Sequence, residues 1–259
     1  MPAAQGERRG PAVRFHIAAD AAATAEMAAD SVEGVIRSNP RASIGLATGA
    51  TMEGVYRSLV RRCQEGSLSF AEATVYLLDE YIGLDADHPQ AYRNVITRSF
   101  TELVDLRDDA VFAPDCRAPD LDTEARRYDR LVRAAGIDIQ LLGIGRNGHI
   151  AFNEPGTPFD AKTNVVSLSK ATRRDNARFF DSAEEVPLQA ITQGTGTILQ
   201  AKQILLVAQG SHKSRPIRDA LEGPVTSEVP ASALQLHGDA SAVLDLEAAS
   251  RLSTDQPQV

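Results

Sequence analysis

Residues 137–156 read IDIQLLGIGRNGHIAFNEPG, a mostly apolar run followed directly by a glycine-rich polar loop. The run Ile137–Leu142 has the length and the side chains of a buried strand. The loop carries an imidazole, amides and a carboxylate before Pro155-Gly156 stops it. A buried strand that ends in such a loop is typical of a parallel sheet, in which ligands gather beyond the carboxyl ends of the strands.

Similar apolar runs recur along the chain and alternate with stretches of helical periodicity. The other expected strands are Val13–Ala18, Ser43–Leu46, Thr74–Leu78, Ile204–Ala208 and Ala242–Leu244. Residues 21–37 carry apolar side chains at helical spacing, and residues 123–135 begin at a Thr or Asp cap and end before a glycine. The alternation predicts an α/β fold, an open doubly wound parallel sheet with helices on both faces, Rossmann-like in its organisation.

The length suits one such domain. A chain of 259 residues, 43% hydrophobic and 24% charged, can bury about three quarters of its unfolded surface. The sequence contains no repeat and no break in composition. We therefore expect a single domain over residues 12–252, with a flexible polar leader at 1–11 and a flexible polar tail at 253–259.

Charge, hydropathy and cysteine content exclude several classes of protein. The 35 acidic residues exceed the 27 basic ones and the basic residues are scattered, so no nucleic-acid partner is expected. No apolar run approaches the roughly 18 to 20 residues that cross a bilayer, so no membrane partner is expected. Cys63 and Cys116 lie far apart without metal-ligand spacing, which is typical of the reducing cytoplasm and indicates no metal site.

A second loop, Ala47-Thr48-Gly49-Ala50-Thr51, joins an expected strand to an expected helix. Its backbone N–H groups, the helix dipole and the hydroxyls of Thr48 and Thr51 suit a phosphate group. A nucleotide P-loop requires Lys-Ser/Thr where this chain has Val55-Tyr56, so ATP chemistry is not expected. A tight turn without a ligand fits the loop equally well when it is considered alone.

Acidic side chains directly follow another expected strand. Asp79 and Glu80 come after Thr74–Leu78, and neighbouring side chains at a strand end point to opposite sides, so at most one faces the crevice. Either could act as a base. A helix cap or a surface pair is the commoner role for such residues.

The loop after Ile137–Leu142 offers an acid–base pair. His149 and Glu154 lie five residues apart on a glycine-flanked loop, an arrangement suited to an imidazole whose protonation a neighbouring acid sets. The loop also contains a literal GxGxxG, but Pro155-Gly156 breaks the chain where a dinucleotide-binding fold requires a long helix. Dinucleotide binding is therefore not expected.

Arg178 and Lys213 are candidate ligands for an anion. Single basic residues near sheet ends are mostly solvated surface. These two would form a phosphomonoester site only if they converge with the loop at 47–51, Arg178 donating paired hydrogen bonds and Lys213 supplying a point charge.

Four blocks of sequence together resemble a known family. They are GLATGAT at 45–51, LDEYIGL at 78–84, the loop at 143–156, and EGPV at 222–225 with PAS at 230–232. In this order they are similar to the motifs of glucosamine-6-phosphate deaminases over nearly the whole chain. Sugar-phosphate lactonases share the fold and a related glycine–histidine loop, but do not continue it as Ile-Ala-Phe-Asn-Glu-Pro. The resemblance favours a deaminase of glucosamine 6-phosphate, with galactosamine 6-phosphate deamination and lactone hydrolysis as alternatives.

The resemblance implies an aldose–ketose isomerisation with deamination, which gives fructose 6-phosphate and ammonia without a cofactor. By motif match, Asp79 would move a proton between C2 and C1 of the sugar, His149 would open the ring and Glu154 would orient the imidazole. Asn147 stands in the same catalytic group, where many members have Asp. The residues implied for phosphate or sugar binding are Thr48, Gly49, Thr51, Arg178 and Lys213.

The resemblance also bears on motion and regulation. Residues 167–187, which carry Arg178 and a charged run, are expected to form a mobile lid. Hexameric members that are activated by N-acetylglucosamine 6-phosphate hold its phosphate with an Arg and a Lys shortly after the Glu-Pro-Gly motif. This chain has Asn164 and Val166 there, which implies no such activation and a monomer or small homo-oligomer.

Overall fold

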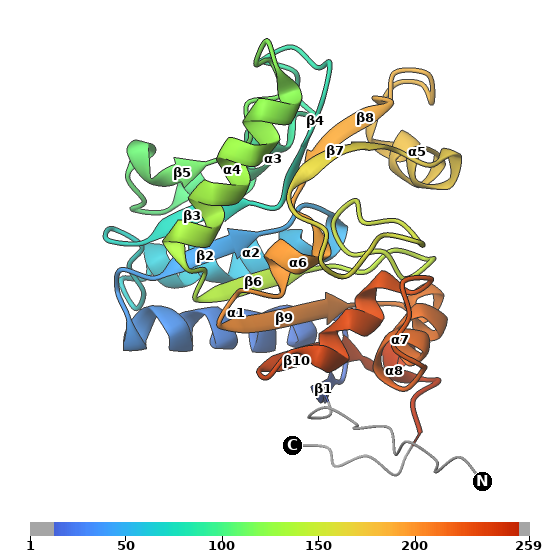
Figure 1. The fold of residues 1–259 in the computed structure, drawn as a ribbon. Coiled ribbons are helices and arrows are strands. Elements are labelled where there is room, and N and C mark those ends of the chain that lie inside the picture. Colours follow the sequence, from blue (N-terminus) through green and yellow to red (C-terminus); the bar gives the residue numbers. More distant parts are fainter. Residues whose placement is uncertain (1–12, 254–259) are drawn as a thin grey trace, which may run out of the picture.

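The structure of this protein is a computed structural model that describes residues 13–253 (Figure 1). The expected leader at 1–11 and the part of the expected tail beyond residue 253 lie outside the described residues. No helix within 13–253 has both the length and the apolar composition of a membrane span.

The central sheet has seven strands, and every neighbouring pair runs parallel. In spatial order the strands are β1 (Arg14–Ala18), β10 (Ala240–Asp245), β9 (Gln203–Ala208), β6 (Ile139–Leu142), β2 (Ser43–Leu46), β3 (Thr74–Leu77) and β5 (Val111–Phe112). All six expected strands are present, with ends that differ by one or two residues. The strand order reverses between β2 and β6, and this switch point is where open parallel sheets bind ligands.

Helices cover both faces of this sheet, as the periodicity predicts. They are α1 (Ala21–Ser38), α2 (Ala50–Gln64), α3 (Tyr92–Ser99), α4 (Leu121–Ala135), α5 (Lys170–Asn176), α6 (Thr195–Ile198), α7 (Ser214–Leu221) and α8 (Leu246–Ala249). In Figure 1, α4 lies in front of the sheet and α1 and α2 lie behind it. The helix expected at 123–135 begins two residues earlier, because the Asp120 carboxylate caps it by accepting from Thr123 N at 2.9 Å.

The middle of the sheet is buried on both faces. All four residues of β2 and of β6 are buried, which is why these strands read as continuous apolar runs. Gly45 of β2 is required by a close approach, since a Cβ there would lie 2.0 Å from Gln140 Oε1 of β6. The absence of a side chain at Gly45 leaves room for the buried amide of Gln140.

A second, antiparallel sheet was not expected from the sequence. Its strands, in order, are β4 (Asp79–Tyr81), β8 (Gln189–Thr192) and β7 (Asn164–Ser167). It stands above the carboxyl edge of the central sheet in Figure 1, and α5 lies beside it. A separate apolar cluster of Tyr81, Phe152, Leu168 and Ala190 packs this sheet against the loop that follows β6.

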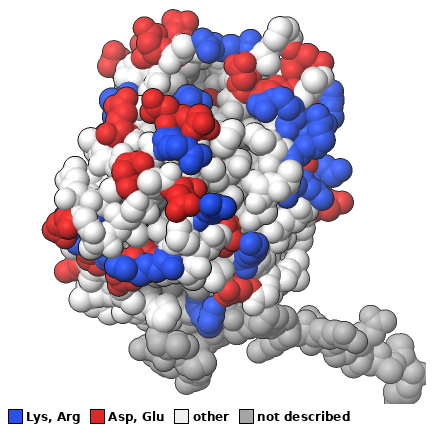
Figure 2. Space-filling model, turned by 90° about the vertical axis from the view of Figure 1, so that its left-hand side faces the viewer, with Lys and Arg blue, Asp and Glu red and all other residues white. Residues whose placement is uncertain are grey.

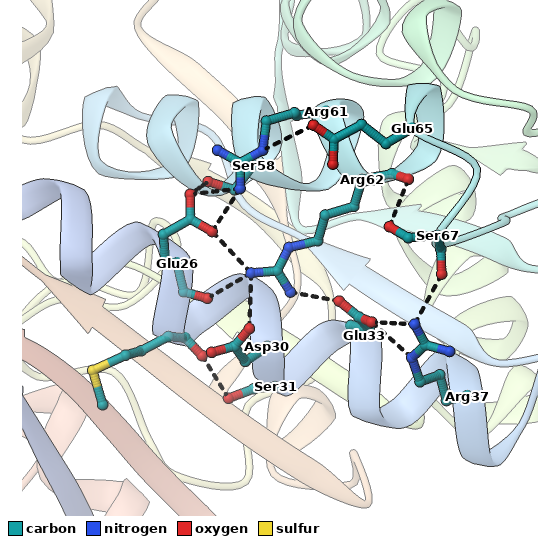
Figure 3. Close-up of polar contacts among 11 residues, drawn as sticks. Glu26, Asp30, Ser31, Glu33, Arg37, Ser58, Arg61, Arg62, Glu65 and Ser67 are labelled. Carbon is teal, nitrogen blue, oxygen red and sulfur yellow. Dashed lines mark hydrogen bonds and ion pairs between the residues drawn. The ribbon is translucent and has the colours of Figure 1, made fainter.

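An ionic cluster joins α1 to α2 on the outside of the fold (Figure 3). The Arg62 guanidinium donates to Glu26 at 2.9 Å and to Glu33 at 2.6 Å, and it lies 2.8 Å from Asp30. Its side chain is only 11% exposed. The hydrogen bond from Ser58, with those from the arginines, lowers the pKa of Glu26 to about 2. The cluster is therefore ionised at neutral pH and stabilises the contact between the two helices.

Replacing Arg62→Met is expected to lower the free energy of unfolding by about 1 to 3 kcal/mol, because three carboxylates lose their shared cation. The pKa of Glu26 is lowered on folding, so its contribution is full above its ordinary value of 4.5 and is lost as the pH falls towards about 2. Urea unfolding at several pH values should therefore show the difference shrinking below pH 4.5. The exposed Arg41, which pairs with Glu72 at 3.0 Å, is the control, and Arg41→Met should change stability by less than about 0.5 kcal/mol. A difference that persists at the lowest pH would contradict this account.

Candidate active site

The candidate residues lie mainly at one edge of the central sheet. The loops that follow β2, β3, β6 and β9 all leave its carboxyl edge, on the right in Figure 1, where β9 points. They carry Thr48 and Gly49, Asp79, the loop at 143–156, and Lys213 in that order. Parallel strands bring these distant parts of the sequence together, as expected.

The loop at 143–156 is shaped around His149. A Cβ on Gly145 would lie 2.2 Å from His149 Cε1, so the glycine lets the imidazole lie directly on the backbone. Gly145 N donates to His149 O at 2.9 Å. Gly148 has φ +82, and a Cβ there would lie 2.8 Å from Val229 Cγ1. The glycines of the loop therefore leave room for the His149 imidazole and for Val229.

The His149 imidazole is half-buried, with its Nδ1 buried, and is only loosely paired. Its Nδ1 lies 3.9 Å from Glu154 Oε2, and within the described residues this nitrogen has no hydrogen-bond partner. Burial lowers the pKa of His149, the charge of Glu154 opposes that shift, and the charge of Lys213 adds to it. The imidazole is therefore neutral near pH 7 and able to accept a proton.

Glu154 is held by hydrogen bonds. Asn147 Nδ2 donates to its Oε2 at 2.7 Å, and Thr172 Oγ1 on α5 donates to its Oε1. Burial favours the protonated form, but the Thr172 hydrogen bond, the imidazole and the Asn147 amide outweigh it and lower the pKa of Glu154. Asn147 also accepts from His149 N at 3.3 Å. The amide thus connects the backbone of the histidine to the acid.

The two adjacent carboxylates after β3 have different environments. Glu80 accepts from Tyr81 N, Tyr92 N and Arg93 N, each at 2.8 Å, and so caps the start of α3. Asp79 is 5% exposed, and no hydrogen bond to its carboxylate is found in the described part of the chain. Burial, with the charge of Glu80, raises the pKa of Asp79 well above its usual range. The sequence left the choice open, and these contacts leave Asp79 as the candidate base.

The loop after β2 presents a helix N-terminus. Gly49 precedes α2 with φ +128, a conformation that favours glycine, and Gly49 and Ala50 are exposed. Thr51 is the second residue of this 15-residue helix, where backbone N–H groups and the dipole attract an anion. The hydroxyl of Thr48 lies beside the Tyr92 phenol.

Arg178 and Lys213 come together although they lie on different elements. Burial, followed by the charges of Arg146 and Arg178, lowers the pKa of Lys213 to about 8. Lys213 Nζ donates to Ile144 O at 2.6 Å, which places the ammonium against the histidine loop. Arg178 is exposed just after α5, and its guanidinium lies 4.6 Å from the centre of the Phe179 ring. Lys213 therefore lies against the histidine loop, within electrostatic reach of Arg178.

Several polar residues of this region were not predicted from the sequence. Tyr92 Oη donates to Tyr81 Oη at 3.1 Å, and Asn176 Nδ2 of α5 donates to the same oxygen at 2.8 Å. Together with Thr48, these groups form a polar chain from the loop after β2 to α5. Only the LDEY motif could have indicated Tyr81, because β4, with three residues, is too short for its alternation of side chains to be recognised in the sequence.

A pocket lies between α5 and the histidine loop. Its lining residues are Arg146, Asn147, His149, Ala171, Thr172, Arg174 and Asp175. Arg146 Nε lies 3.6 Å from Asp175 Oδ2 across it. The segment expected to be a lid therefore rests on the loop that carries His149, and its mobility stays a prediction. No cluster of three metal-binding side chains occurs within residues 13–253.

Comparisons with known proteins agree with this architecture. The model of the glucosamine-6-phosphate isomerase/6-phosphogluconolactonase family matches residues 17–243. Glucosamine-6-phosphate deaminase 1 of Bacillus subtilis is 47% identical over 226 residues, which are 87% of this chain and 93% of that protein. The deaminase of Corynebacterium urealyticum is 51% identical over 211 residues, 81% of this chain and 82% of that protein.

Solved structures also separate the two branches of the fold. A monomeric glucosamine-6-phosphate deaminase is 44% identical, with a TM-score of 0.90 over 92% of this chain and 100% of that chain. The 6-phosphogluconolactonase of Trypanosoma brucei is 21% identical, with a TM-score of 0.71 over 93% and 99%, and it shares the fold alone. The predicted α/β fold and the resemblance to the deaminases are both confirmed. This chain belongs to the glucosamine-6-phosphate deaminase family.

Proposed function

We propose that this protein converts glucosamine 6-phosphate and water into fructose 6-phosphate and ammonia. The observation that carries the proposal is that a buried carboxylate, Asp79, and a neutral imidazole, His149, both follow strands of the central sheet at the same edge of that sheet. The reaction needs two separate proton transfers, one at the ring oxygen and one at carbon. These two groups supply one site for each.

His149 opens the sugar ring in this proposal. The neutral imidazole takes the proton of the C1 hydroxyl and returns a proton to the ring oxygen, which leaves an open-chain aldehyde. The low pKa of His149 keeps the imidazole neutral, and therefore available as a base, near pH 7, and the nearby charge of Glu154 stabilises the imidazolium that forms. Glu154 and Asn147 orient the ring and its loop.

Asp79 then moves the carbon-bound proton. The carboxylate takes the proton from C2 and delivers it to C1, while a second proton passes from the nitrogen on C2 to the oxygen on C1, and together these transfers convert the amino aldose to a ketose imine. Water hydrolyses this imine to the ketone and releases ammonia. Since burial raises the pKa of Asp79 well above its usual range, activity should fall on the acid side at a higher pH than for an exposed carboxylate. All steps are proton transfers or hydrolysis, so no cofactor is proposed.

The same region offers hydrogen-bond donors and cations that suit the phosphate of the substrate. We propose that it meets the N-terminus of α2 at Gly49 and Thr51, the hydroxyl of Thr48, and the side chains of Arg178 and Lys213. A dianion would favour the protonated form of Lys213, whose pKa is lowered to about 8 by its surroundings. Substrate binding would thus supply the counter-charge that this lysine lacks.

Ammonia release from glucosamine 6-phosphate tests the function. The same preparation is offered galactosamine 6-phosphate and 6-phosphogluconolactone, which represent the two alternatives. Stoichiometric ammonia and fructose 6-phosphate from the first substrate are expected. Lactone hydrolysis without ammonia release, or a clear preference for the galactosamine substrate in direct competition, would overturn the assignment.

The proposed partner is a small sugar phosphate in the cytoplasm, without nucleic acid or membrane. Figure 2 views the side of the molecule away from the site, where Asp and Glu are interspersed with Lys and Arg. The net charge is −8. This distribution of charge favours a small anion, bound at a local cationic site, as the partner, and it disfavours a long polyanion.

Asp79→Asn is expected to lower kcat about a hundredfold or more while KM stays nearly unchanged, because the amide keeps the shape but cannot accept the C2 proton. Steady-state ammonia release measures both constants. Glu80→Gln is the matched control, because Glu80 caps α3. This variant should lower the melting temperature and leave kcat nearly unchanged. Near-normal turnover of Asp79→Asn would remove Asp79 from the reaction.

Arg178→Ala and Lys213→Ala should each weaken binding of the phosphorylated sugar by roughly tenfold to a hundredfold, the worth of one charge-assisted hydrogen bond. Binding of unphosphorylated glucosamine should change little, as calorimetry can show. Arg215→Ala and Lys170→Ala are controls, since both residues are exposed and close in sequence to the tested ones. Equal losses for both sugars would place the tested residues outside the phosphate site.

The chain should be a monomer or a small homo-oligomer with hyperbolic kinetics. Asn164 opens β7 and Val166 lies within it, where neither side chain supplies the cation that an effector phosphate needs. A monomeric relative supports the smaller assembly. Light scattering and rate curves with and without N-acetylglucosamine 6-phosphate measure the two properties. Sigmoidal curves that become hyperbolic with the acetylated sugar would contradict the predicted kinetics, and a hexamer would contradict the predicted assembly.

A further inference from the structure

Asp79 has a direct cross-strand neighbour in the second sheet. It pairs with Thr192 in the antiparallel register of β4 with β8, two strands that lie side by side in Figure 1. The backbone bond from Gln193 N to Leu78 O, 2.9 Å long, belongs to the adjacent pair. Asp79 and Thr192 therefore form a non-hydrogen-bonded pair, the kind in which facing side chains lie closest. The two side chains are neighbours on the same face of the sheet.

This face turns towards the loop at 143–156. Thr192 is fully buried, and its Oγ1 accepts from Phe152 N at 3.1 Å. Phe152 belongs to the segment between His149 and Glu154. The Thr192 side chain thus contacts the loop that carries the imidazole and neighbours the carboxylate on the opposite strand.

The hydroxyl of Thr192 has a hydrogen that no close acceptor takes. Within residues 13–253 its only acceptor is Gln193 O, at 3.4 Å, which is long for a hydroxyl bond. Asp79 is 5% exposed, and its carboxylate accepts no hydrogen bond in the same part of the chain. A weakly used donor therefore lies beside a buried acceptor that has none.

The other titratable groups around Asp79 do not offer it a cation. They are Glu80 and Tyr81 on its own strand, Tyr92 on α3 and Tyr128 on α4. Strand β8 and residues 150–153 carry no titratable side chain. The Tyr128 hydroxyl donates to the backbone at 2.7 Å, and that of Tyr92 donates to Tyr81 Oη at 3.1 Å. Neither of these two hydrogens is available to the carboxylate.

We propose that Thr192 is a positioning residue for Asp79, and that its hydroxyl donates to the ionised carboxylate while Phe152 N holds its oxygen. Rotation of the Asp79 side chain can bring the two groups into contact, because the Cβ atoms of such a pair lie about 4.5 to 5.5 Å apart. The proposal rests on Asp79 being the base of the proposed function. Burial raises the pKa of Asp79, so a base at this place needs a donor that favours its ionised form.

Thr192→Val tests the proposal, because valine keeps the shape and removes the hydroxyl. The carboxyl ¹³C signal of Asp79 is titrated by NMR in the substrate-free protein and is assigned with Asp79→Asn. The pKa of Asp79 should be about one unit higher in Thr192→Val, because the ionised form loses its donor. Thr192→Ser restores the hydroxyl and should return the pKa to within about 0.3 units of the unmodified protein. An unchanged or lower pKa in Thr192→Val would overturn the proposal.

Thr195→Val is the matched control. Thr195 is as buried as Thr192, and its Oγ1 has no hydrogen-bond partner among the described residues. This variant also exchanges a buried hydroxyl for a methyl group in the same segment, and it should leave the pKa of Asp79 unchanged. An equal rise in Thr195→Val would show that any loss of a buried hydroxyl shifts Asp79, and would overturn the specific role of Thr192.

A measurement on the unmodified protein keeps the test decisive if Thr192→Val does not fold. The Thr192 hydroxyl proton is buried and therefore slow to exchange, and its NMR signal can be assigned with Thr192→Ser. This signal should move downfield with the same midpoint as the Asp79 carboxyl, because the bond to an ionised acceptor is shorter and stronger. A hydroxyl signal that does not respond when Asp79 ionises would overturn the proposal.

Activity measurements separate this proposal from the proposed function. The acid limb of the pH profile of kcat should move upward in Thr192→Val by the same amount as the NMR value, with KM nearly unchanged, and Thr192→Ser should restore it. A titration shift in a protein without deaminase activity would reject the proposed function and keep the positioning role. Normal deaminase activity without a titration shift would do the reverse.

Discussion

One residue, Leu78, joins the last strand position of β3 in the central sheet to the first of β4 in the second sheet, and the site depends on its two backbone hydrogen bonds. Leu78 N donates to Leu46 O at 2.9 Å, which extends the parallel pairing of β3 with β2, and Leu78 O accepts from Gln193 N at 2.9 Å, which begins the pairing of β4 with β8. The chain therefore changes sheets exactly where a loop would normally start. Asp79 is buried at this junction as a result, and β8 and β7 position the segment that carries α5 over the edge of the central sheet.

The central sheet was predictable because its strands are buried on both faces and read as apolar runs. β5, with only Val111 and Phe112, is too short for any periodicity to show. The small sheet was missed for a related reason, since β7 is half-buried to exposed and β4 contains two acids. Glu80 can be buried because three backbone N–H groups donate to its carboxylate. Asp79 is buried where β4 pairs with β8 in the second sheet. Both are tertiary effects that no local sequence pattern contains.

The site residues divide in the same way. Asp79, His149 and Lys213 follow strands of the central sheet, so the rule that ligands gather beyond carboxyl ends located them. Thr172 and Tyr81 depend on the placement of the second sheet relative to the first, which the sequence does not reveal. The choice between Asp79 and Glu80 also required the structure, because only the three N–H donors around Glu80 show which carboxylate is structural.

The electrostatics of the site have one common feature. Burial works against the charged form of Asp79, His149 and Lys213 alike, and it also opposes the charge of Glu154, whose pKa is nevertheless lowered by hydrogen bonds from Thr172, Asn147 and Ser169 and by the charge of His149. The amide of Asn147 is important in this respect. An aspartate at that position would remove a donor from Glu154 and add a like charge, and both changes would raise the pKa of Glu154. With Asn147, the acid keeps a hydrogen-bond donor that belongs to the same loop as His149, in addition to the donor from α5.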